Sequence, residues 1–273
     1  MLQKFYKYHG AGNDFLLADN RDGLLSLSAD QVRHLCDRHT GFGSDGVMLL
    51  EKSETLDFKM VFYNPDGSSG MMCGNGGRCI VAFAAFLGVV SGNFPVEFEA
   101  SDGAHTAVIL DPDNIRLKMR DVKGIVDYPE DQACFLNTGT RHLVKFIEGL
   151  ESMDVVSEGR ILRSDPRFMP EGTNVDFVEV VGEGSLRVRT FEKGVEDETL
   201  ACGTGIVASA LAAWSRGIPG KPVDGGTVSY SVRAAISGLE VEFTPDGSRE
   251  GFHASDVWLQ GPVAYVGSVE CLM

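Results

Sequence analysis

The sequence predicts an α+β fold (α/β in the broad sense) of two pseudo-symmetric domains, each a curved, mostly antiparallel sheet around one central helix. Residues 73–88 and 202–217 repeat each other: each begins Cys-Gly-x-Gly, continues as an Ala-rich apolar run and ends on a glycine fifteen positions after the cysteine. Neither run has a strong polar face, which is typical of a helix enclosed by sheet. Strand-like segments flank both runs. We therefore expect an active site in the cleft between the domains, with one cysteine from each.

In the first half, the pattern indicates strands, one short helix and the first buried helix. Ser28, followed three residues later by Gln31, has the spacing of a capping box and predicts a helix over 28–38. Asn-Pro-Asp-Gly at 64–67 predicts a turn. Strands are expected from apolar and β-branched runs at 5–8, 15–18, 46–50, 58–63, 96–99, 106–110 and 115–119.

The second half is expected to follow a crossover at 121–129. Its polar segment 192–199 predicts a loop that leads into the second buried helix. A final strand at 264–269 fits either half from its pattern alone. The other strands are expected at 143–146, 174–180, 186–191, 227–236, 239–243 and 257–260.

Length and charge exclude several classes of protein. A chain of 273 residues with 43% hydrophobic residues is long enough to bury the cores of two domains. The formal net charge of −15 argues against nucleic acid or an acidic membrane as a partner. The first ten residues carry dispersed charges, and no apolar run approaches the ~20 residues of a membrane span. We therefore expect a cytoplasmic protein without a signal peptide.

The six cysteines lack the CxxC spacing of a zinc site or a redox dithiol, so we expect no metal. Nor does any lysine stand out as the activated residue that pyridoxal phosphate requires, so we expect no cofactor. Cys36, Cys79, Cys134 and Cys271 are predicted to be buried apolar residues. Cys73 and Cys202 differ because each begins a predicted helix, where unpaired N–H groups and the helix dipole favour a thiolate.

The spacing of these two thiols suggests acid–base chemistry on one carbon. If they approach a carbon from opposite faces, one removes a proton and the other returns it. The glycines after each cysteine leave backbone N–H groups uncovered, and such a helix start binds an anion such as a substrate carboxylate. The same groups stabilise the charge that develops when the α-proton leaves.

Several motifs, in order along the chain, resemble those of the diaminopimelate epimerase family. The resemblance covers essentially the whole chain and implies cofactor-independent interconversion of LL- and meso-2,6-diaminopimelate, an isomerase step in lysine and peptidoglycan precursor biosynthesis. The motifs are HGAGNDF at 9–15, GFGSDG at 41–46, NPDGS at 64–68, MCGNGGRC at 72–79, GTNVDF at 172–177 and EKGVEDETLACGTG at 192–205.

The resemblance also assigns roles to individual residues. Cys73 and Cys202 match the two cysteines that exchange the roles of thiolate base and thiol acid. Glu192 matches an acid that holds the distal ammonium group, and His142 matches a histidine that supports the protonation of the thiols. The remaining substrate-binding positions are Asn13, Asn64 and Asn174, with Gly74, Asn75, Gly203 and Thr204 around the carboxylate.

The resemblance further implies a homodimer and a C-terminal strand that returns to the first domain. The expected domains are therefore residues 1–118 plus 263–273, which carry Cys73, and residues 119–262, which carry Cys202.

Three positions depart from the family pattern: Thr140, Arg141 and Lys193. At 139–142 the chain has Gly-Thr-Arg-His instead of Gly-Asn-Pro-His or Gly-Ser-Pro-His. Lys193 replaces an arginine that grips the distal carboxylate, and an ammonium lacks the bidentate fork of a guanidinium. Our hypothesis is that Arg141 supplies the missing guanidinium; the alternative is an exposed loop arginine.

Two other functions remain open from the sequence. One is a related racemase of a different amino acid, suggested by the same three departures. The other is a thiol-based redox or binding protein, which predicts a reversible Cys73–Cys202 disulfide as its working state. Turnover of an amino acid without a second amino-carboxylate end favours the first, whereas activity that requires a reductant argues against the second.

Overall fold

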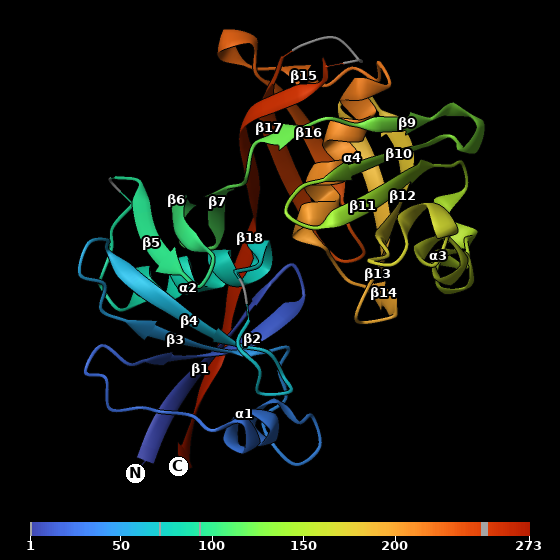
Figure 1. The fold of residues 1–273 in the computed structure, drawn as a ribbon. Helices are drawn as coiled ribbons and strands as arrows, with labels where there is room; N and C mark the ends of the chain where they lie inside the picture. Colours follow the sequence, from blue (N-terminus) through green and yellow to red (C-terminus); the bar gives the residue numbers. More distant parts are fainter. Residues whose placement is uncertain (1, 71, 93, 247–250) are drawn as a thin grey trace. The chain divides into compact units, whose positions relative to one another are not determined.

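The computed structural model describes residues 2–70, 72–92, 94–246 and 251–273. The chain divides into two compact units: unit 1 contains Met1–Leu117 and Gly261–Met273, and unit 2 contains Lys118–Gln260. Each unit is built of strands around helices (Figure 1). The α+β class expected from the sequence is therefore confirmed.

The sheet of unit 1 closes on itself. Its strands follow in the order β18, β1, β2, β3, β4, β5, β6 and β7, and β7 pairs again with β18. The strands are β1 (Leu2–Gly10), β2 (Asn13–Asp19), β3 (Val47–Glu51), β4 (Phe58–Tyr63), β5 (Val96–Ala100), β6 (Gly103–Asp111), β7 (Asn114–Lys118) and β18 (His253–Leu272).

Unit 2 repeats this arrangement with its own strands. The strand order is β9, β10, β11, β12, β13, β16, β17, β18 and β8. In addition, β14 pairs with β13, and β15 pairs with β16. The strands are β8 (Val122–Lys123), β9 (Val126–Tyr128), β10 (Ala133–Asn137), β11 (Arg141–Phe146), β12 (Asn174–Gly182), β13 (Ser185–Glu192), β14 (Asp197–Thr199), β15 (Lys221–Pro222), β16 (Val228–Arg233) and β17 (Gly238–Asp246).

Strand directions confirm the pseudo-symmetry. From β18 through β7, neighbours are antiparallel except for two parallel pairs, β2–β3 and β4–β5. From β9 through β18, the parallel pairs are β11–β12 and β13–β16, in the same places of the order. Parallel neighbours need a crossover connection, and a helix lies in each of the four. The helices are α1 (Ala29–Cys36), α2 (Gly74–Phe86), α3 (Val155–Arg163) and α4 (Gly203–Ser215).

Helices α2 and α4 are the predicted central helices. In α2 every residue from Gly74 to Ala84 is buried, and α4 is buried from Gly203 to Ala213 except at Thr204. The small side chains of these Ala-rich segments let the surrounding strands approach closely from several sides, and in Figure 1 strands surround α4. Helices without a polar face need such an enclosure to remove their apolar surface from water.

Helices α1 and α3 cover the outer faces of the two sheets. Val32 and Leu35 of α1 pack with Leu16 and Leu49. The predicted capping box is present: Gln31 N–H donates to Ser28 Oγ, and Ser28 N–H donates to Gln31 Oε1.

Helix α3 was not predicted from the sequence, and it packs on β12 and β13 through the cluster that contains Val155, Val175 and Phe191. The expected crossover at 121–129 holds β8 and β9, and the expected loop 192–199 ends in β14.

The C-terminal strand belongs to both sheets. Residues up to Gln260 pair with β17, and residues from Val263 onward pair with β1. Leu2 and Leu272 are partners, so the two ends of the described chain lie side by side (Figure 1). Two separate strands, at 257–260 and 264–269, were expected here, whereas the structure has one continuous strand.

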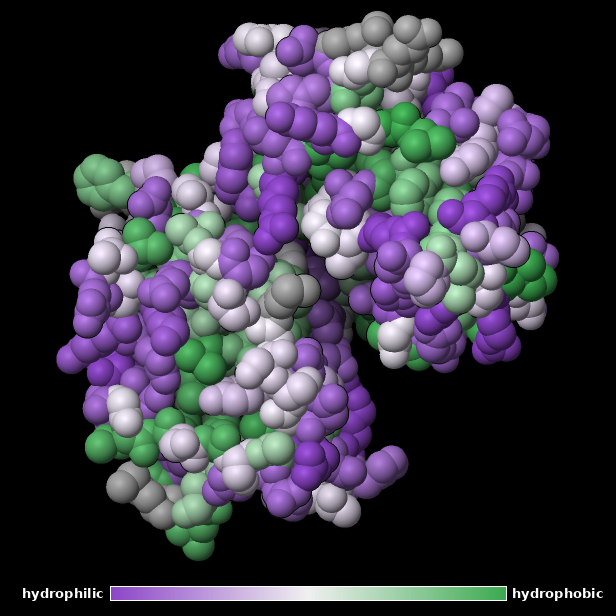
Figure 2. All heavy atoms as spheres, in the orientation of Figure 1, coloured by the Kyte–Doolittle hydropathy of each residue, from purple (hydrophilic) through white to green (hydrophobic). Residues whose placement is uncertain are grey.

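The exposed surface is largely hydrophilic on the face that one view shows. Hydrophilic residues cover much of the face shown in Figure 2. Among the described residues, no helix is long and apolar enough to cross a membrane. Three of the four cysteines expected to be buried are buried, while Cys271 near the C-terminus is only partly so.

Candidate active site

In unit 1, Cys73 is the N-cap residue of α2. Its backbone is extended (φ −113°, ψ 154°), and its Sγ accepts a hydrogen bond from the Gly76 N–H at 3.2 Å. A Cβ on Gly76 would lie only 3.2 Å from that sulfur, so glycine lets the amide reach the thiol. Cys73 thus lies at a glycine-rich helix start, as predicted, and the structure shows that it is partly buried.

Two predicted substrate-binding residues of unit 1 contact each other. Asn75 Nδ2 donates to Asn13 Oδ1 at 3.4 Å, and Asn13 Nδ2 donates to Asp45 Oδ2 at 2.6 Å. The Asn75 backbone is pressed against β1, because a Cβ on Gly10 would lie 2.8 Å from the Asn75 carbonyl oxygen. The first turn of α2, with Gly74, is thereby fixed beside the β1–β2 turn.

Asn64 makes its described hydrogen bonds inside its own turn. Its Nδ2 donates to Ser68 Oγ at 3.0 Å and to the Ser69 carbonyl oxygen at 3.4 Å. These bonds leave the position of Asn64 well defined, while its role in substrate binding stays a prediction.

In unit 2, Cys202 is the N-cap residue of α4 and is buried. The helix start was expected to favour the thiolate, but burial raises the pKa of this thiol, and the negative charges of Glu192 and Asp176 raise it further. Hydrogen bonds from Thr204 and from the Gly205 backbone act in the opposite direction. Burial of a thiolate beside two carboxylates outweighs the helix dipole, so the raised pKa favours the thiol form of Cys202.

A chain of hydrogen-bonding groups leads from Cys202 into the core of unit 2. Thr204 Oγ1 lies 3.4 Å from Cys202 Sγ and 3.0 Å from His142 Nε2. His142 Nδ1 lies 2.7 Å from Asp176 Oδ2, and both side chains are completely buried. Thr140 Oγ1 also contacts His142 Nε2, at 2.9 Å. Three of the predicted residues, Thr140, His142 and Thr204, are thus brought together beside the thiol.

Asp176 is the member of this chain that the sequence reasoning missed. It lies on β12 between Asn174 and Val178, and all three residues are buried. Its Oδ1 accepts a hydrogen bond from Thr190 Oγ1 at 2.7 Å. In the sequence Asp176 alternates with Val175 and Phe177, which is typical of the polar face of a strand, so the pattern gave no sign that this carboxylate is buried and requires a partner.

Gly205 makes room for Asp176, and this leads to a prediction. A Cβ at position 205 would lie 2.3 Å from Asp176 Oδ1, so we expect Gly205→Ala to destabilise unit 2 by about 1–3 kcal/mol. Urea unfolding measures the change. Gly238→Ala is the matched control, because a Cβ there meets no atom within 4 Å. Equal stability of the two variants would contradict the close approach.

The two charged departures from the expected family pattern converge on one loop. Lys193 Nζ donates to the Glu171 carbonyl oxygen at 2.9 Å, and Arg141 Nη1 lies 2.8 Å from Glu171 Oε2. The Lys193 backbone N–H donates to Asn174 Oδ1 at 2.8 Å. Arg141 is therefore an ion-paired residue, with its guanidinium 5.1 Å from the Phe135 ring centroid, and not a free loop cation.

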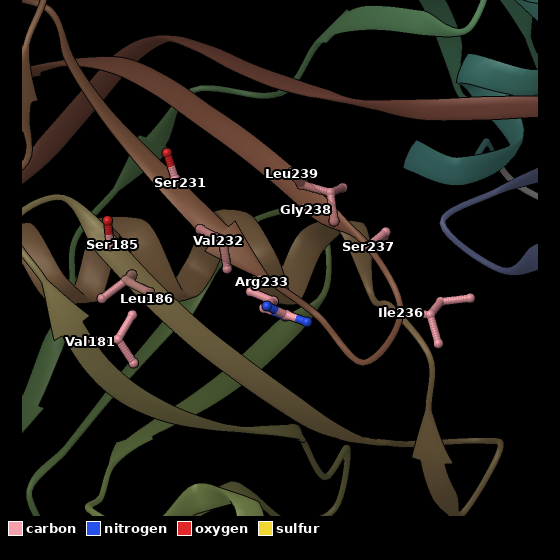
Figure 3. A pocket seen from close by; sticks show the side chains of 10 residues that line it. All are labelled: Val181, Ser185, Leu186, Ser231, Val232, Arg233, Ile236, Ser237, Gly238 and Leu239. Carbon is pink, nitrogen blue, oxygen red and sulfur yellow. The ribbon is translucent and has the colours of Figure 1, made fainter.

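A separate pocket of about 360 Å³ lies elsewhere in unit 2. Its lining comes from β12, β13, β16, β17 and the turn between β16 and β17, and it includes five apolar side chains, three serines and Arg233 (Figure 3). It contains none of the predicted site residues, so this pocket is not where the candidate chemistry lies.

Comparison with known proteins relates almost the whole chain to one family. The family model described as diaminopimelate epimerase matches residues 5–122 and 134–244. The diaminopimelate epimerase of Flavobacterium psychrophilum is 40% identical over 266 residues, which cover 96% of this chain and 98% of that protein. That of Chlorobaculum tepidum is 46% identical over 211 residues, covering 76% of this chain and 82% of that protein.

Solved structures share the fold at low identity. A PhzF-family phenazine biosynthesis protein from Bacillus anthracis has a TM-score of 0.74 and 14% identity, with both chains fully covered. A hydroxyproline epimerase from Agrobacterium vitis has a TM-score of 0.69 and 18% identity, covering 99% of this chain and 91% of that one.

Proposed function

Because this chain belongs to the diaminopimelate epimerase family, we propose that it interconverts LL- and meso-2,6-diaminopimelate with two cysteine thiols and without a cofactor. The enzyme is an isomerase that serves lysine and peptidoglycan precursor biosynthesis. The observation that carries the mechanism is the duplication: each unit has one cysteine as the N-cap of a buried, Ala-rich helix.

The reaction needs one base and one acid. A thiolate removes the α-proton and becomes a thiol, while the opposite thiol delivers its proton to the other face of the carbon and becomes a thiolate. The configuration inverts, and the substrate gains and loses one proton. Since the pKa of Cys202 is raised, we assign the acid role at rest to Cys202 and the base role to Cys73.

Backbone amides stabilise the intermediate charge. The backbone N–H groups at the starts of α2 and α4, around Gly74, Asn75, Gly203 and Thr204, are proposed to bind the carboxylate beside the reacting carbon. Charge that moves from the α-carbon into that carboxylate then meets hydrogen-bond donors that are already in place. Asn13, Asn64, Asn174 and Glu192 are proposed to hold the rest of the substrate.

The test is proton NMR of LL-diaminopimelate with the reduced protein in D₂O. The wild-type enzyme should replace the α-proton signal by deuterium as meso product forms. Cys73→Ala and Cys202→Ala should each abolish epimerisation, because each lacks one of the two proton-transferring groups. Epimerisation that survives in either variant would falsify the two-thiol mechanism.

A substrate panel separates this function from the racemase alternative. If diaminopimelate exchanges no proton while an amino acid without a second amino-carboxylate end does, the altered-specificity racemase is correct.

We also propose that Arg141 recognises the distal carboxylate in place of the arginine that Lys193 replaces. Support comes from the contacts of both Arg141 and Lys193 with Glu171.

The test of this proposal is the KM of an Arg141 variant. Loss of a hydrogen bond to a charged group typically weakens binding by a factor of about ten or more, so Arg141→Ala should raise KM for diaminopimelate about tenfold with little change in kcat. Arg167→Ala is the matched control, since Arg167 pairs with Asp165 and Asp131. An unchanged KM in the Arg141 variant would remove the idea.

The domain roles, assembly and compartment complete the proposal. Units 1 and 2 act as the two epimerase domains, each carrying one thiol. All six cysteines lie within the described residues and none forms a disulfide there, which supports a reducing, cytoplasmic location. The family resemblance supports a homodimer, and sedimentation analysis of the intact chain tests it.

A further inference from the structure

Arg78 is a buried cation inside the apolar helix α2. Its side chain is completely buried, the largest such side chain among the described residues. Its Nη2 donates to Asn75 Oδ1 at 2.7 Å, while Nε and Nη1 have no hydrogen-bond partner in the described part of the chain. Burying a guanidinium with most of its donors unmet is costly, so the cation of Arg78 requires a compensating interaction.

The charge of Arg78 is not neutralised by a carboxylate of the described chain. Among those residues, no Asp or Glu forms an ion pair with Arg78, and burial lowers the pKa of its guanidinium. The first turn of α2 also lacks an acidic residue, although acids commonly offset the positive end of a helix there. Two unneutralised positive features, the helix start and the Arg78 cation, therefore coincide at the Cys73 end of α2.

The other ionisable groups around α2 do not supply the missing negative charge. Cys79 is fully buried, and burial raises the pKa of its thiol, so it is neutral. Burial likewise raises the pKa of Tyr8 on β1 to about 12. Other charged groups on the packed strands have partners elsewhere: Asp14 of β2 with Lys7 and Arg38, Glu51 of β3 with Asn20 and Lys59, and His105 of β6 with Asp102. The remaining thiol whose negative charge acts on Arg78 is that of Cys73.

The duplicated motif provides an internal comparison. Five positions after Cys73 stands Arg78, and five positions after Cys202 stands Val207, which is also fully buried. Around Cys202 the buried charges are instead negative, from Glu192 and Asp176. The two thiols thus occupy matching places in the fold with surroundings of opposite charge.

We propose that Arg78 is a positioning residue that keeps Cys73 as the resting thiolate and orients Asn75 toward Asn13. Its cation balances the thiolate before substrate binds and the substrate carboxylate afterwards. Its Nη2 donor fixes the carboxamide oxygen of Asn75, so that the amide group of Asn75 points to Asn13. The first part concerns the thiol alone, whereas the second rests on the proposed substrate-binding role of Asn75.

Alkylation by iodoacetamide tests the first part without substrate. The rate at each cysteine is followed by peptide mass spectrometry as a function of pH in the wild-type protein. The midpoint of a profile is the pH at which the alkylation rate of that cysteine reaches half of its maximum. Differences in solvent exposure change the alkylation rate by the same factor at every pH and leave the midpoint unchanged, so the midpoints of the two cysteines are compared. The Cys73 midpoint is expected to lie below the Cys202 midpoint; coincident midpoints would overturn the proposal.

Variants at position 78 separate charge from geometry. Arg78→Met removes the charge and should raise the Cys73 midpoint by about one pH unit, so that alkylation below the midpoint is roughly tenfold slower. Arg78→Lys keeps the charge and should restore the midpoint. Its KM for diaminopimelate should stay raised, because an ammonium does not reproduce the guanidinium contact with Asn75.

Val207→Ala controls for loss of packing in a buried helix and should leave the Cys73 midpoint unchanged. A wild-type midpoint in Arg78→Met would overturn the charge role, and a wild-type KM in Arg78→Lys would overturn the orienting role. If Arg78→Met does not fold, the alkylation profiles of the wild type and of Arg78→Lys still test the charge role, and the KM of Arg78→Lys still tests the orienting role. A shifted midpoint in an enzyme that does not turn over diaminopimelate would leave this inference standing while the proposed function fails.

Discussion

Replacing Asp176 with Asn is expected to lower kcat by on the order of 10²–10⁴ while leaving unit 2 folded. The carboxylate fixes His142 at 2.7 Å, and His142 contacts the Thr204 hydroxyl that lies beside Cys202. Asparagine has nearly the same shape but presents an N–H donor where the carboxylate can only accept. The change therefore alters hydrogen-bond directions without creating a cavity.

The direction of each hydrogen bond explains the size of the effect. Thr190 donates to one oxygen of Asp176, and the other oxygen accepts the proton on His142 Nδ1. His142 Nε2 then has one lone pair, which accepts the Thr204 hydroxyl, while the Thr140 hydroxyl can donate to Thr204 Oγ1 3.0 Å away. In Asp176→Asn, a side-chain amide that donates to Nδ1 would move the ring proton to Nε2 and reverse that polarity, so the Thr204 hydroxyl would lose its acceptor next to the thiol.

Measurements of kcat and of urea unfolding separate this role from simple stability. Thr190→Val is the matched control, because it removes a hydrogen bond to Asp176 and leaves the contact with His142. It should cost about 1 kcal/mol of unfolding free energy with little loss of kcat. If Asp176→Asn retains kcat within threefold of wild type, His142 does not act through this carboxylate.

The parts of the fold that follow local rules were predictable from the sequence. The Ser28–Gln31 capping box, the turn at 64–67 and the two cysteine N-caps each depend on a few neighbouring residues, and each is present. The enclosure of α2 and α4 followed from their lack of a polar face, since such helices are stable only when covered on all sides.

The parts that were missed depend on contacts between distant residues. Helix α3 contains Gly159 in its interior, which lowers helix propensity. A Cβ there would lie 2.4 Å from Phe191 Cβ, so the glycine is required by packing against β13. The roles of Asp176 and Arg78 were missed because the sequence does not show which distant residues surround a charged side chain or which partner compensates its charge.

Cys202 gives the second large effect, which is on pH dependence. Burial first, and then Glu192 and Asp176, raise the pKa of this thiol above the ~8.5 of an ordinary cysteine. Its alkylation rate should therefore still rise about tenfold per pH unit between pH 8 and 9.5, where an unperturbed thiol levels off. Glu192→Gln removes one negative charge and should move the Cys202 profile to lower pH.

The same shift couples Cys202 to stability. A thiol whose pKa is higher in the folded than in the unfolded chain binds more protons when folded, so its stabilising contribution is complete below the unfolded pKa. It is lost as pH rises from about 8.5 toward the folded value. Burial also raises the pKa of Cys79 and of Cys134, the latter to about 11, so these thiols contribute to the same decline.

The contribution of Cys202 is therefore the difference between wild type and Cys202→Ala. Urea unfolding between pH 8 and 10 should show a steeper loss of stability in the wild type, and parallel slopes would mean that Cys202 titrates like an unfolded thiol. That outcome would also remove the charge asymmetry on which the assignment of Cys202 as the resting acid depends, because a thiol with an ordinary pKa in both states would have no preference for the protonated form.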